Sequence, residues 1–274
     1  MIGIGKNLFK SNVKVVGGAS TDPDAQAFIT AAGITDATQK SAVNQLVLDL
    51  KGYSIWTKMK AIYPIVGGSA SSHKWNLKDP RDLNAAFRLT FATGMTHSST
   101  GFTSNGASGY ANTNLIPLNV MTNNNTSFGI YSRSNLDGLG YDTGIQVAGS
   151  CVFALVTRYL NNYITDQYIN TTNRISASNT DSRGFFQSIR TTSTVFKAYK
   201  NGAQIGTTNT SSSTGFSGTN IPFLICCIND SSTPRYYSTR EYSFMYLGDG
   251  LTDTEAANFY TAVQNYQTTL GRNV

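Results

Sequence analysis

The sequence predicts a mainly β protein, a two-sheet sandwich with a short N-terminal helical segment and a C-terminal helix. About a dozen short apolar runs follow one another from Gly67 onward, roughly 8–12 residues apart, with frequent glycine between them, which is typical of a sandwich. Between residues 21 and 63 the apolar residues instead recur with a helical period. The sequence shows no internal repeat and no heptads, which argues against a β-helix or a coiled-coil shaft.

Residues 1–20 show little periodicity and precede the helical segment, residues 21–66. We interpret them as an extended arm that something else must order: this domain, a neighbouring copy or another protein. The arm is therefore a candidate anchor.

Two capping patterns mark helices in the next segment. Asp22 followed by Pro23 predicts a helix that ends at Gly33, and Asp36 with Gln39 predicts a second one. The second helix carries an apolar face at positions i, i+3, i+4 and i+7, formed by Val43, Leu46, Val47 and Leu50. The spacing of Trp56, Met59 and Tyr63 predicts a short third helix ended by Pro64. Helices this short need a packing partner, and we expect that partner to be the sheet or a second subunit.

The strands that follow differ in how clearly the sequence marks them. The clearest hairpin joins 195–200 to 203–206 through Asn201-Gly202, a pair that favours a type I′ turn. The run from Ile221 to Ile228 is apolar on both faces and predicts a central strand. Further strands are expected at 73–77, 87–91, 110–115, 128–131, 152–156, 163–169, 174–177 and 185–189.

The C-terminal end carries the strongest local signal. Residues 242–246 alternate as a strand, Gly248-Asp249-Gly250 breaks it, and Thr252 with Glu255 forms a capping-box pattern. The helix that follows carries an apolar stripe and stops at Gly271. The stripe consists of Ala256, Phe259, Tyr260, Val263 and Leu270.

The three cysteines indicate buried thiols. Cys226 and Cys227 are adjacent in an apolar run and would point to opposite faces of a strand, so they cannot readily pair with each other. We expect them and Cys151 to be free, with no disulfide framework.

Composition limits the function classes. Hydrophobic residues make up 40% of the chain and charged residues only 13%, about half the usual share. A surface of hydroxyl and amide groups suits β proteins that work outside cells and suits weak hydrogen bonding to sugars, although it can equally reflect how a lineage builds β surfaces. The net charge of +6 comes without the density or motifs of a nucleic-acid binder, so we expect no nucleic acid partner. No apolar run is long enough to span a bilayer, so we expect no membrane insertion.

Two segments of the last third resemble a known fold. The hairpin FKAYKNGAQIGT (196–207) and the ending FMYLGDGLTDTEAANFYTAVQNYQ (244–267) are similar to the concanavalin A-like lectin/glucanase jelly roll, in its laminin-G-like branch. The resemblance implies a jelly roll over residues 67–274.

A second resemblance lies further toward the N-terminus. Residues Asp22–Gly68, followed by HKWNLKDP (73–80), resemble a module of structural proteins of tailed bacteriophages, especially phages of Bacteroidetes, where it precedes such a jelly roll. This implies a virion protein acting as a head or tail fibre, a decoration or a tail-tip component. Its partners would be other virion proteins and copies of itself, with a trimer as one arrangement. It would be made in the host bacterial cytoplasm without a signal peptide.

The carboxylates do not favour an enzyme. Glucanases of this fold use two glutamates flanking an aspartate on one strand, whereas this chain has only Glu241 and Glu255, and Glu255 is explained by helix capping. His73 and His97 are isolated in the sequence, which favours surface or hydrogen-bonded histidines over metal ligands. Asp137 and Asp142 share a glycine-rich loop that gives only a weak calcium signal. We therefore expect no catalytic residues, no bound metal and no cofactor.

Tyrosines on polar loops are the candidate ligand-binding residues. Tyr236 and Tyr237 follow a polar loop, and Tyr163 and Tyr168 lie in an asparagine-rich stretch. Most tyrosines of a sandwich are half-buried, so these four are candidates for sugar contact only. The sequence thus favours a non-enzymatic virion structural protein. The alternatives are an adhesin that recognises host or mucosal glycans and, less favoured, a glycan hydrolase.

Overall fold

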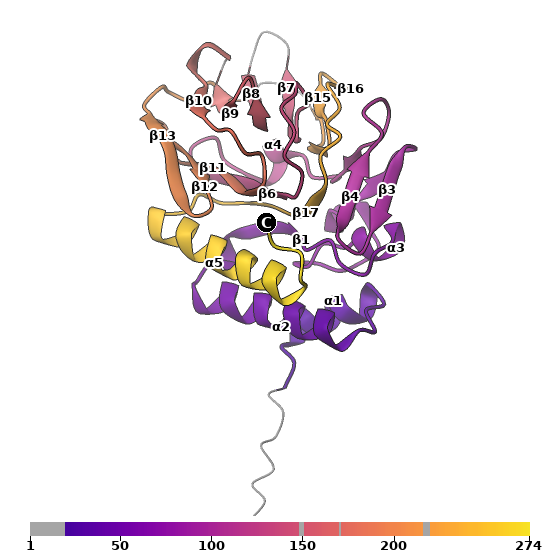
Figure 1. The fold of residues 1–274 in the computed structure, drawn as a ribbon. Coiled ribbons are helices and arrows are strands. Elements are labelled where there is room, and N and C mark those ends of the chain that lie inside the picture. Colours follow the sequence, from indigo (N-terminus) through magenta and orange to yellow (C-terminus); the bar gives the residue numbers. More distant parts are fainter. Residues whose placement is uncertain (1–19, 148–150, 170, 216–219) are drawn as a thin grey trace, which may run out of the picture.

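The computed structural model describes residues 20–147, 151–169, 171–215 and 220–274, so the arm expected over residues 1–20 lies almost wholly outside the described residues. These residues form three layers: helices, an eight-stranded sheet and a nine-stranded sheet (Figure 1). The mainly β two-sheet sandwich with N- and C-terminal helices is confirmed.

The eight-stranded sheet lies in the middle. Its order is β13-β12-β11-β6-β17-β4-β3, β1 also pairs with β17, and its neighbouring strands are antiparallel. Its strands are β1 (Met59–Tyr63), β3 (Met95–Ser98), β4 (Gly101–Ser104), β6 (Thr126–Ser132), β11 (Gly184–Thr192), β12 (Val195–Lys200), β13 (Ala203–Asn209) and β17 (Tyr242–Gly248).

The nine-stranded sheet forms the layer farthest from the helices. Its order is β10-β9-β8-β7-β14-β5-β2, and β15 runs parallel to β7 and antiparallel to β16. Its strands are β2 (Thr90–Phe91), β5 (Ala111–Asn112), β7 (Thr143–Val147), β8 (Cys151–Tyr159), β9 (Asn162–Ile169), β10 (Ile175–Ser178), β14 (Leu224–Ile225), β15 (Ile228–Asp230) and β16 (Thr233–Arg235).

Three helices cover the outer face of the eight-stranded sheet: α1 (Pro23–Ala31), α2 (Ala37–Gly52) and α5 (Asp253–Thr269) (Figure 1). The expected caps are present, because Asp22 accepts from the Asp24 N–H, Asp36 accepts from the Gln39 N–H, and Thr252 with Glu255 forms a capping box. The short turns are α3 (Ala70–His73), α4 (Pro117–Val120), η1 (Trp56–Lys58), η2 (Asn84–Ala86) and η3 (Thr171–Asn173). Among the described residues, none of the helices combines the length and the hydrophobicity of a transmembrane segment.

Two hydrophobic cores hold the layers together. One lies between the sheets and includes Phe128, Phe153 and Phe223, whose rings meet edge to face. The other joins the helices to the middle sheet, with Leu46 of α2 and Phe259 of α5 packed in the same cluster. The sheet is therefore a packing partner of the helices, as expected.

The third helix predicted from Trp56, Met59 and Tyr63 is wrong. Only η1 is helical there, and residues 59–63 form β1, which pairs with residues 245–248 of β17. Tertiary pairing overrides the helical spacing, because β17 pairs with β4 only at Tyr242 and the backbone groups of its residues 245–248 pair with β1. A domain boundary after residue 66, as expected, would therefore separate β1 from the sandwich to which this strand belongs.

Other expected strands are shorter or absent. Residues 73–77 are not a strand, since α3 ends there, and strands within 87–91 and 110–115 cover only two residues each. The run 221–228 is broken because Cys226 has a φ of 70°, which separates β14 from β15. Cys226 and Cys227 are nevertheless buried free thiols, as expected. At the 201–202 turn both residues have positive φ, which confirms the type I′ hairpin.

Candidate functional site

Two of the four candidate tyrosines are core residues, so that part of the prediction is wrong. Tyr163 is fully buried and its hydroxyl donates to the Gln187 carbonyl at 3.0 Å. Tyr168 is buried and its ring stacks on Phe153, with the centroids 4.7 Å apart. Both side chains fill the space between the sheets, where no ligand can reach them. The polar residues around them in sequence obscured this inward orientation.

Tyr236 and Tyr237 lie at the surface, directly after β16. Tyr236 is 51% exposed, and its backbone is left-handed, with a φ of 53°. Its ring lies 6.0 Å from the ring of Tyr141, and its carbonyl accepts from the Tyr141 N–H at 2.9 Å. These contacts hold Tyr236 against the sheet with much of its ring open to solvent.

An ion pair lies beside Tyr141 in the nine-stranded sheet. Arg174 donates to the buried carboxylate of Asp166 at 2.7 Å. Burial raises the pKa of Asp166 to about 6, although Arg174 acts in the opposite direction. Burial also raises the pKa of the Tyr141 hydroxyl, which interacts with Arg174. The base beneath Tyr236 is thus a packed polar cluster.

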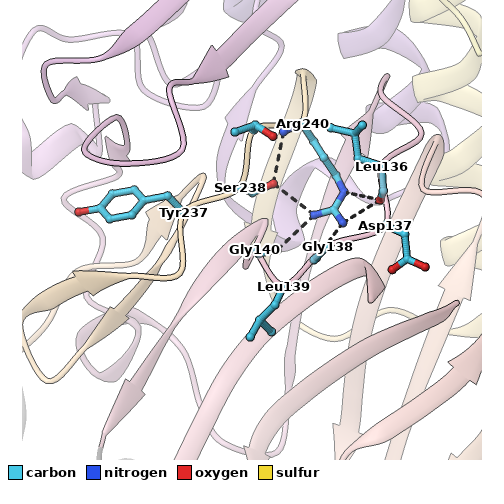
Figure 2. A pocket seen from close by; sticks show the side chains of 9 residues that line it. Leu136, Asp137, Gly138, Leu139, Gly140, Tyr237, Ser238 and Arg240 are labelled. Carbon is cyan, nitrogen blue, oxygen red and sulfur yellow. Dashed lines mark hydrogen bonds between the residues drawn. The ribbon is translucent and has the colours of Figure 1, made fainter. Parts of the chain in front are cut away.

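A shallow pocket of about 230 Å³ opens next to these tyrosines (Figure 2). Its walls are the loop 136–140 and the segment 237–240. The two approach so closely that a Cβ on Gly140 would lie 2.7 Å from the Cα of Ser238, so glycine is required there. Leu136 and Leu139 of the same loop are exposed, which gives the pocket apolar edges.

We call Tyr236, Tyr237 and the loop 136–140 the Tyr236 surface. Figure 2 shows the side chains of Tyr237, Leu139 and Asp137 directed away from the guanidinium of Arg240, which lies at the base of this surface. Asp137 is held by Arg158 at 3.5 Å and by the Asn161 N–H at 3.1 Å.

Arg240 organises the loop. Its guanidinium donates to the carbonyls of Leu136 (2.9 Å), Gly138 (3.2 Å) and Gly140 (3.2 Å), which are three residues of the pocket wall. It also donates to the Arg158 carbonyl at 2.5 Å and forms an ion pair with Asp142 at 3.0 Å. Burial lowers the pKa of Arg240, but the charges of Asp142 and Tyr242 and the hydrogen bonds to them together outweigh it, and the pKa ends above its usual value.

Asp142 is fully buried and saturated with donors. Besides Arg240 it accepts from the Thr157 N–H and the hydroxyls of Tyr242 and Ser238. Its oxygens are therefore committed to the fold, which removes it from the weak calcium signal noted in the sequence. Among the described residues no three His, Cys, Asp or Glu side chains are grouped to hold a metal. No sequence pattern indicated the Arg240–Asp142 pair, because its members lie 98 positions apart.

The histidines, isolated in sequence, meet in the structure. Their Nδ1 atoms are 3.0 Å apart, and Nε2 of His73 accepts from the Gly68 N–H at 3.1 Å. His73 must therefore carry its proton on Nδ1 and donate to His97. Burial, together with the charges of His97 and Arg272, lowers the pKa of His73 to about 3. The pair is hydrogen-bonded, and neither histidine lines the Tyr236 surface.

The glutamates are also engaged. Glu241 accepts from Arg133 at 2.7 Å and from Thr100 at 2.5 Å. Glu255 accepts from the Thr252 N–H and pairs with Lys58 at 2.6 Å, which confirms its capping role.

Comparison with known proteins places the chain by fold. No family model and no curated protein matches it. A mutant of Trypanosoma rangeli sialidase displaying trans-sialidase activity is similar with a TM-score of 0.51 and 11% identity, covering 83% of this chain and 39% of that chain. Trypanosoma rangeli sialidase in complex with 2,3-difluoro-KDN gives a TM-score of 0.50 and 10% identity, covering 81% and 39%. The chain thus spans about two fifths of these sialidase chains, and at such identities the likeness shows the fold alone.

Proposed function

We propose that this chain is a non-enzymatic structural protein of a tailed-phage particle, and that its jelly roll binds glycans through the Tyr236 surface. The proposal of glycan binding rests on one observation. The ring of Tyr236 is exposed beside an open pocket and is held by Tyr141 and the backbone. A rigid tyrosine offers an apolar face together with a hydroxyl, which suits the mixed apolar and hydroxyl surface of a sugar.

The pocket wall supplies the polar part of such a site. Its loop is short of side chains, with Gly138 and Gly140, so peptide groups and small hydroxyl residues such as Thr239 border the opening. Ligand sites commonly combine an apolar lining with a few fixed polar groups. Arg240 supplies the fixation, since it ties down three carbonyls of the loop. A site held in advance loses less entropy when it binds.

The proposal that the protein is not an enzyme rests on the hydrogen bonds and ion pairs of the nearby carboxylates. Retaining glycoside hydrolysis needs two carboxyl groups about 5 Å apart, one of them free to donate a proton. Asp142 is saturated by four donor groups, Asp137 is held by Arg158, and Glu241 is held by Arg133. These carboxylates serve structural roles, which supports a binding rather than a hydrolytic role.

The proposal of a role in a phage particle rests on the resemblance of residues 22–68 to a phage structural module. The arrangement of the layers supports it, because α1 and α2 lie on the opposite side of the molecule from the β15–β16 hairpin (Figure 1). Attachment through the N-terminal side would leave the Tyr236 surface outward. A homo-oligomer, with a trimer as one form, is part of the proposal and is measured by light scattering.

A glycan array tests the binding role. The full chain is compared with Tyr236→Asn, since asparagine tolerates the left-handed backbone at this position, and with Tyr53→Asn on the helical side as a matched control. We expect the control to bind like the parent chain and Tyr236→Asn to lose binding. Equal binding by all three would remove the Tyr236 surface, and release of reducing sugar from a bound glycan would show an enzyme.

The attachment role needs its own test. A chain without residues 1–20 is offered to assembling particles alongside the full chain. We expect the shortened chain to be left out of the particles. Unchanged incorporation would refute the anchor.

A further inference from the structure

One exposed carboxylate lies on the wall of the pocket in Figure 2. Asp137 belongs to the loop 136–140, and its side chain is 31% exposed. Figure 2 shows its carboxyl group on the opposite side of Leu139 from the ring of Tyr237, with both groups directed away from the buried guanidinium of Arg240. Asp137 and Tyr237 therefore mark two ends of one pocket.

The carboxyl group of Asp137 has one oxygen committed to the protein. The Asn161 N–H donates to Oδ2 at 3.1 Å, and Nε of Arg158 lies 3.5 Å from the same atom. Within the described ranges 20–147, 151–169, 171–215 and 220–274, no group donates a hydrogen bond to Oδ1. Oδ2 thus fixes the side chain to the neighbouring turn, and Oδ1 remains an acceptor for a ligand.

The groups that hold Asp137 are themselves fixed. The guanidinium of Arg158 donates to Asn161 Oδ1 at 2.6 Å and to Asn135 Oδ1 at 2.9 Å. The Gly138 N–H donates to the Arg158 carbonyl at 3.3 Å, which ties the loop to the end of β8. Because these contacts set the position of Asp137 before a ligand arrives, binding costs little side-chain entropy.

The cations near the pocket are engaged within the protein. Arg240 is the one cation among the described residues that line the pocket, its side chain is 2% exposed, and its three guanidinium nitrogens all donate to protein oxygens. Arg235, the neighbour of Tyr236 in sequence, is paired with Asp230 at 3.3 Å. An ionised carboxylate such as Asp137 only accepts hydrogen bonds. A ligand carboxylate beside it would therefore place two acceptors and two negative charges together, which disfavours such a ligand.

The other groups of the pocket suit hydroxyl-rich molecules. Thr239 is exposed, and its hydroxyl makes no hydrogen bond to any other residue that the structure describes. This hydroxyl can donate or accept. Leu139, which is 49% exposed, adds an apolar contact between Asp137 and Tyr237. A sugar offers hydroxyl groups that donate, hydroxyl groups that accept and an apolar face, so it matches these groups.

We propose that Asp137 determines the specificity of the Tyr236 surface, which binds neutral oligosaccharides and rejects acidic ones such as sialylated or uronic acid glycans. A hydroxyl group of one sugar unit donates to Oδ1 of Asp137, and a second unit lies on the tyrosines at the other end. This inference rests on the proposed glycan-binding function and names its substrate class.

The ranking of glycans on the array gives the first test. The array carries neutral oligosaccharides together with sialylated and uronic acid glycans. We expect the tightest ligands of the full chain to be neutral and to keep their affinity in EDTA. Tightest binding to glycans that carry a carboxylate would overturn the proposal. Loss of binding in EDTA would also overturn it, because a metal ion would then use Oδ1.

Asp137→Asn tests the residue itself. The Asn161 N–H and Arg158 require an acceptor at the position of Oδ2, so the amide oxygen takes that position and the NH₂ group replaces Oδ1. The outward group changes from an acceptor to a donor at almost constant size. We expect the affinity for neutral glycans to fall about tenfold, because a hydrogen bond to a charged group is lost, and the affinity for acidic glycans to rise.

Asp181→Asn is the matched control. Asp181 is also an exposed aspartate paired with an arginine, at 2.9 Å from Arg183, but it does not line the pocket. This variant should rank and bind the glycans as the parent chain does. Unchanged affinity for neutral glycans in folded Asp137→Asn would overturn the proposal. If Asp137→Asn does not fold, the ranking by the parent chain still decides.

The two proposals fail in different ways. Loss of binding in Tyr236→Asn, with the parent ranking kept in Asp137→Asn, would keep the proposed function and remove the specificity role. A changed ranking in Asp137→Asn, with full binding in Tyr236→Asn, would keep Asp137 as a sugar contact and remove the contact with Tyr236.

Discussion

Replacing Arg240 with leucine should both destabilise the fold and release the loop of the Tyr236 surface. The side chains of Arg240 and Asp142 are 2% and 0% exposed, so each charge depends on the other for compensation. Removal of one member of a buried ion pair costs about 3–5 kcal/mol, because the remaining charge is left without its counterion. The carbonyls of Leu136, Gly138 and Gly140 also lose a donor, but they border an open pocket where water can replace it. We therefore expect Arg240→Leu to lower the free energy of unfolding by about 4 kcal/mol.

Urea unfolding followed by circular dichroism measures this loss. The matched control is Arg183→Leu, whose ion pair with Asp181 has side chains 47% and 37% exposed, and it should cost far less because solvent screens this pair. The double variant Asp142→Asn/Arg240→Leu should recover part of the loss, since no lone charge remains buried and the amide oxygen of asparagine can still accept from the donors around position 142. A cost for Arg240→Leu no larger than that of Arg183→Leu would refute the reasoning.

Three further predictions concern the fold and its pH response. The pKa of His73 is about 3 in the folded protein, against 6.5 for an ordinary histidine. Below pH 6.5 the unfolded chain therefore binds a proton that the folded chain does not, and the free energy of unfolding falls by up to about 1.4 kcal/mol per pH unit. His73→Gln should flatten this slope in urea unfolding. Tyr163→Ala should lower the free energy of unfolding by about 3–5 kcal/mol and leave the glycan affinity of the folded fraction unchanged. Deletion of residues 1–66 removes β1 and two helices, so calorimetry should show no cooperative transition. An unchanged slope, a drop in affinity or a sharp transition would contradict these statements in turn.

Local signals in the sequence predicted the elements that are defined locally. The caps at Asp22, Asp36 and Thr252 and the turn at Asn201-Gly202 depend on residues within a few positions of one another, and each is confirmed. The sandwich follows from strand spacing and is confirmed as well.

The errors arise where distant residues decide the outcome. Residues 59–63 have helical spacing but pair with β17, which lies nearly two hundred positions away, as the Ile62–Tyr246 partners show. Cys226 breaks an apolar run through a left-handed backbone that its side chain does not announce.

The same reasoning applies to the site. Tyr163 has polar neighbours in sequence yet faces the core, because consecutive residues of β9 such as Tyr163 and Ile164 point to opposite faces of the sheet. Arg240 gave no signal at all, since a charged residue rarely becomes fully buried and its partner Asp142 is far away in sequence. Only Tyr236 and Tyr237, which follow an exposed polar loop, kept the surface position that the sequence predicted.

The central claim is that the Tyr236 surface binds glycans. Isothermal titration of the best array glycan into the parent chain, Tyr236→Asn and Tyr53→Asn tests it most directly, with circular dichroism confirming that all three are folded. The account predicts equal affinity for the parent and Tyr53→Asn and at least a fivefold loss for Tyr236→Asn, about the worth of one stacking contact of roughly 1 kcal/mol. Equal affinity in all three chains, or no glycan that binds the parent, would contradict it.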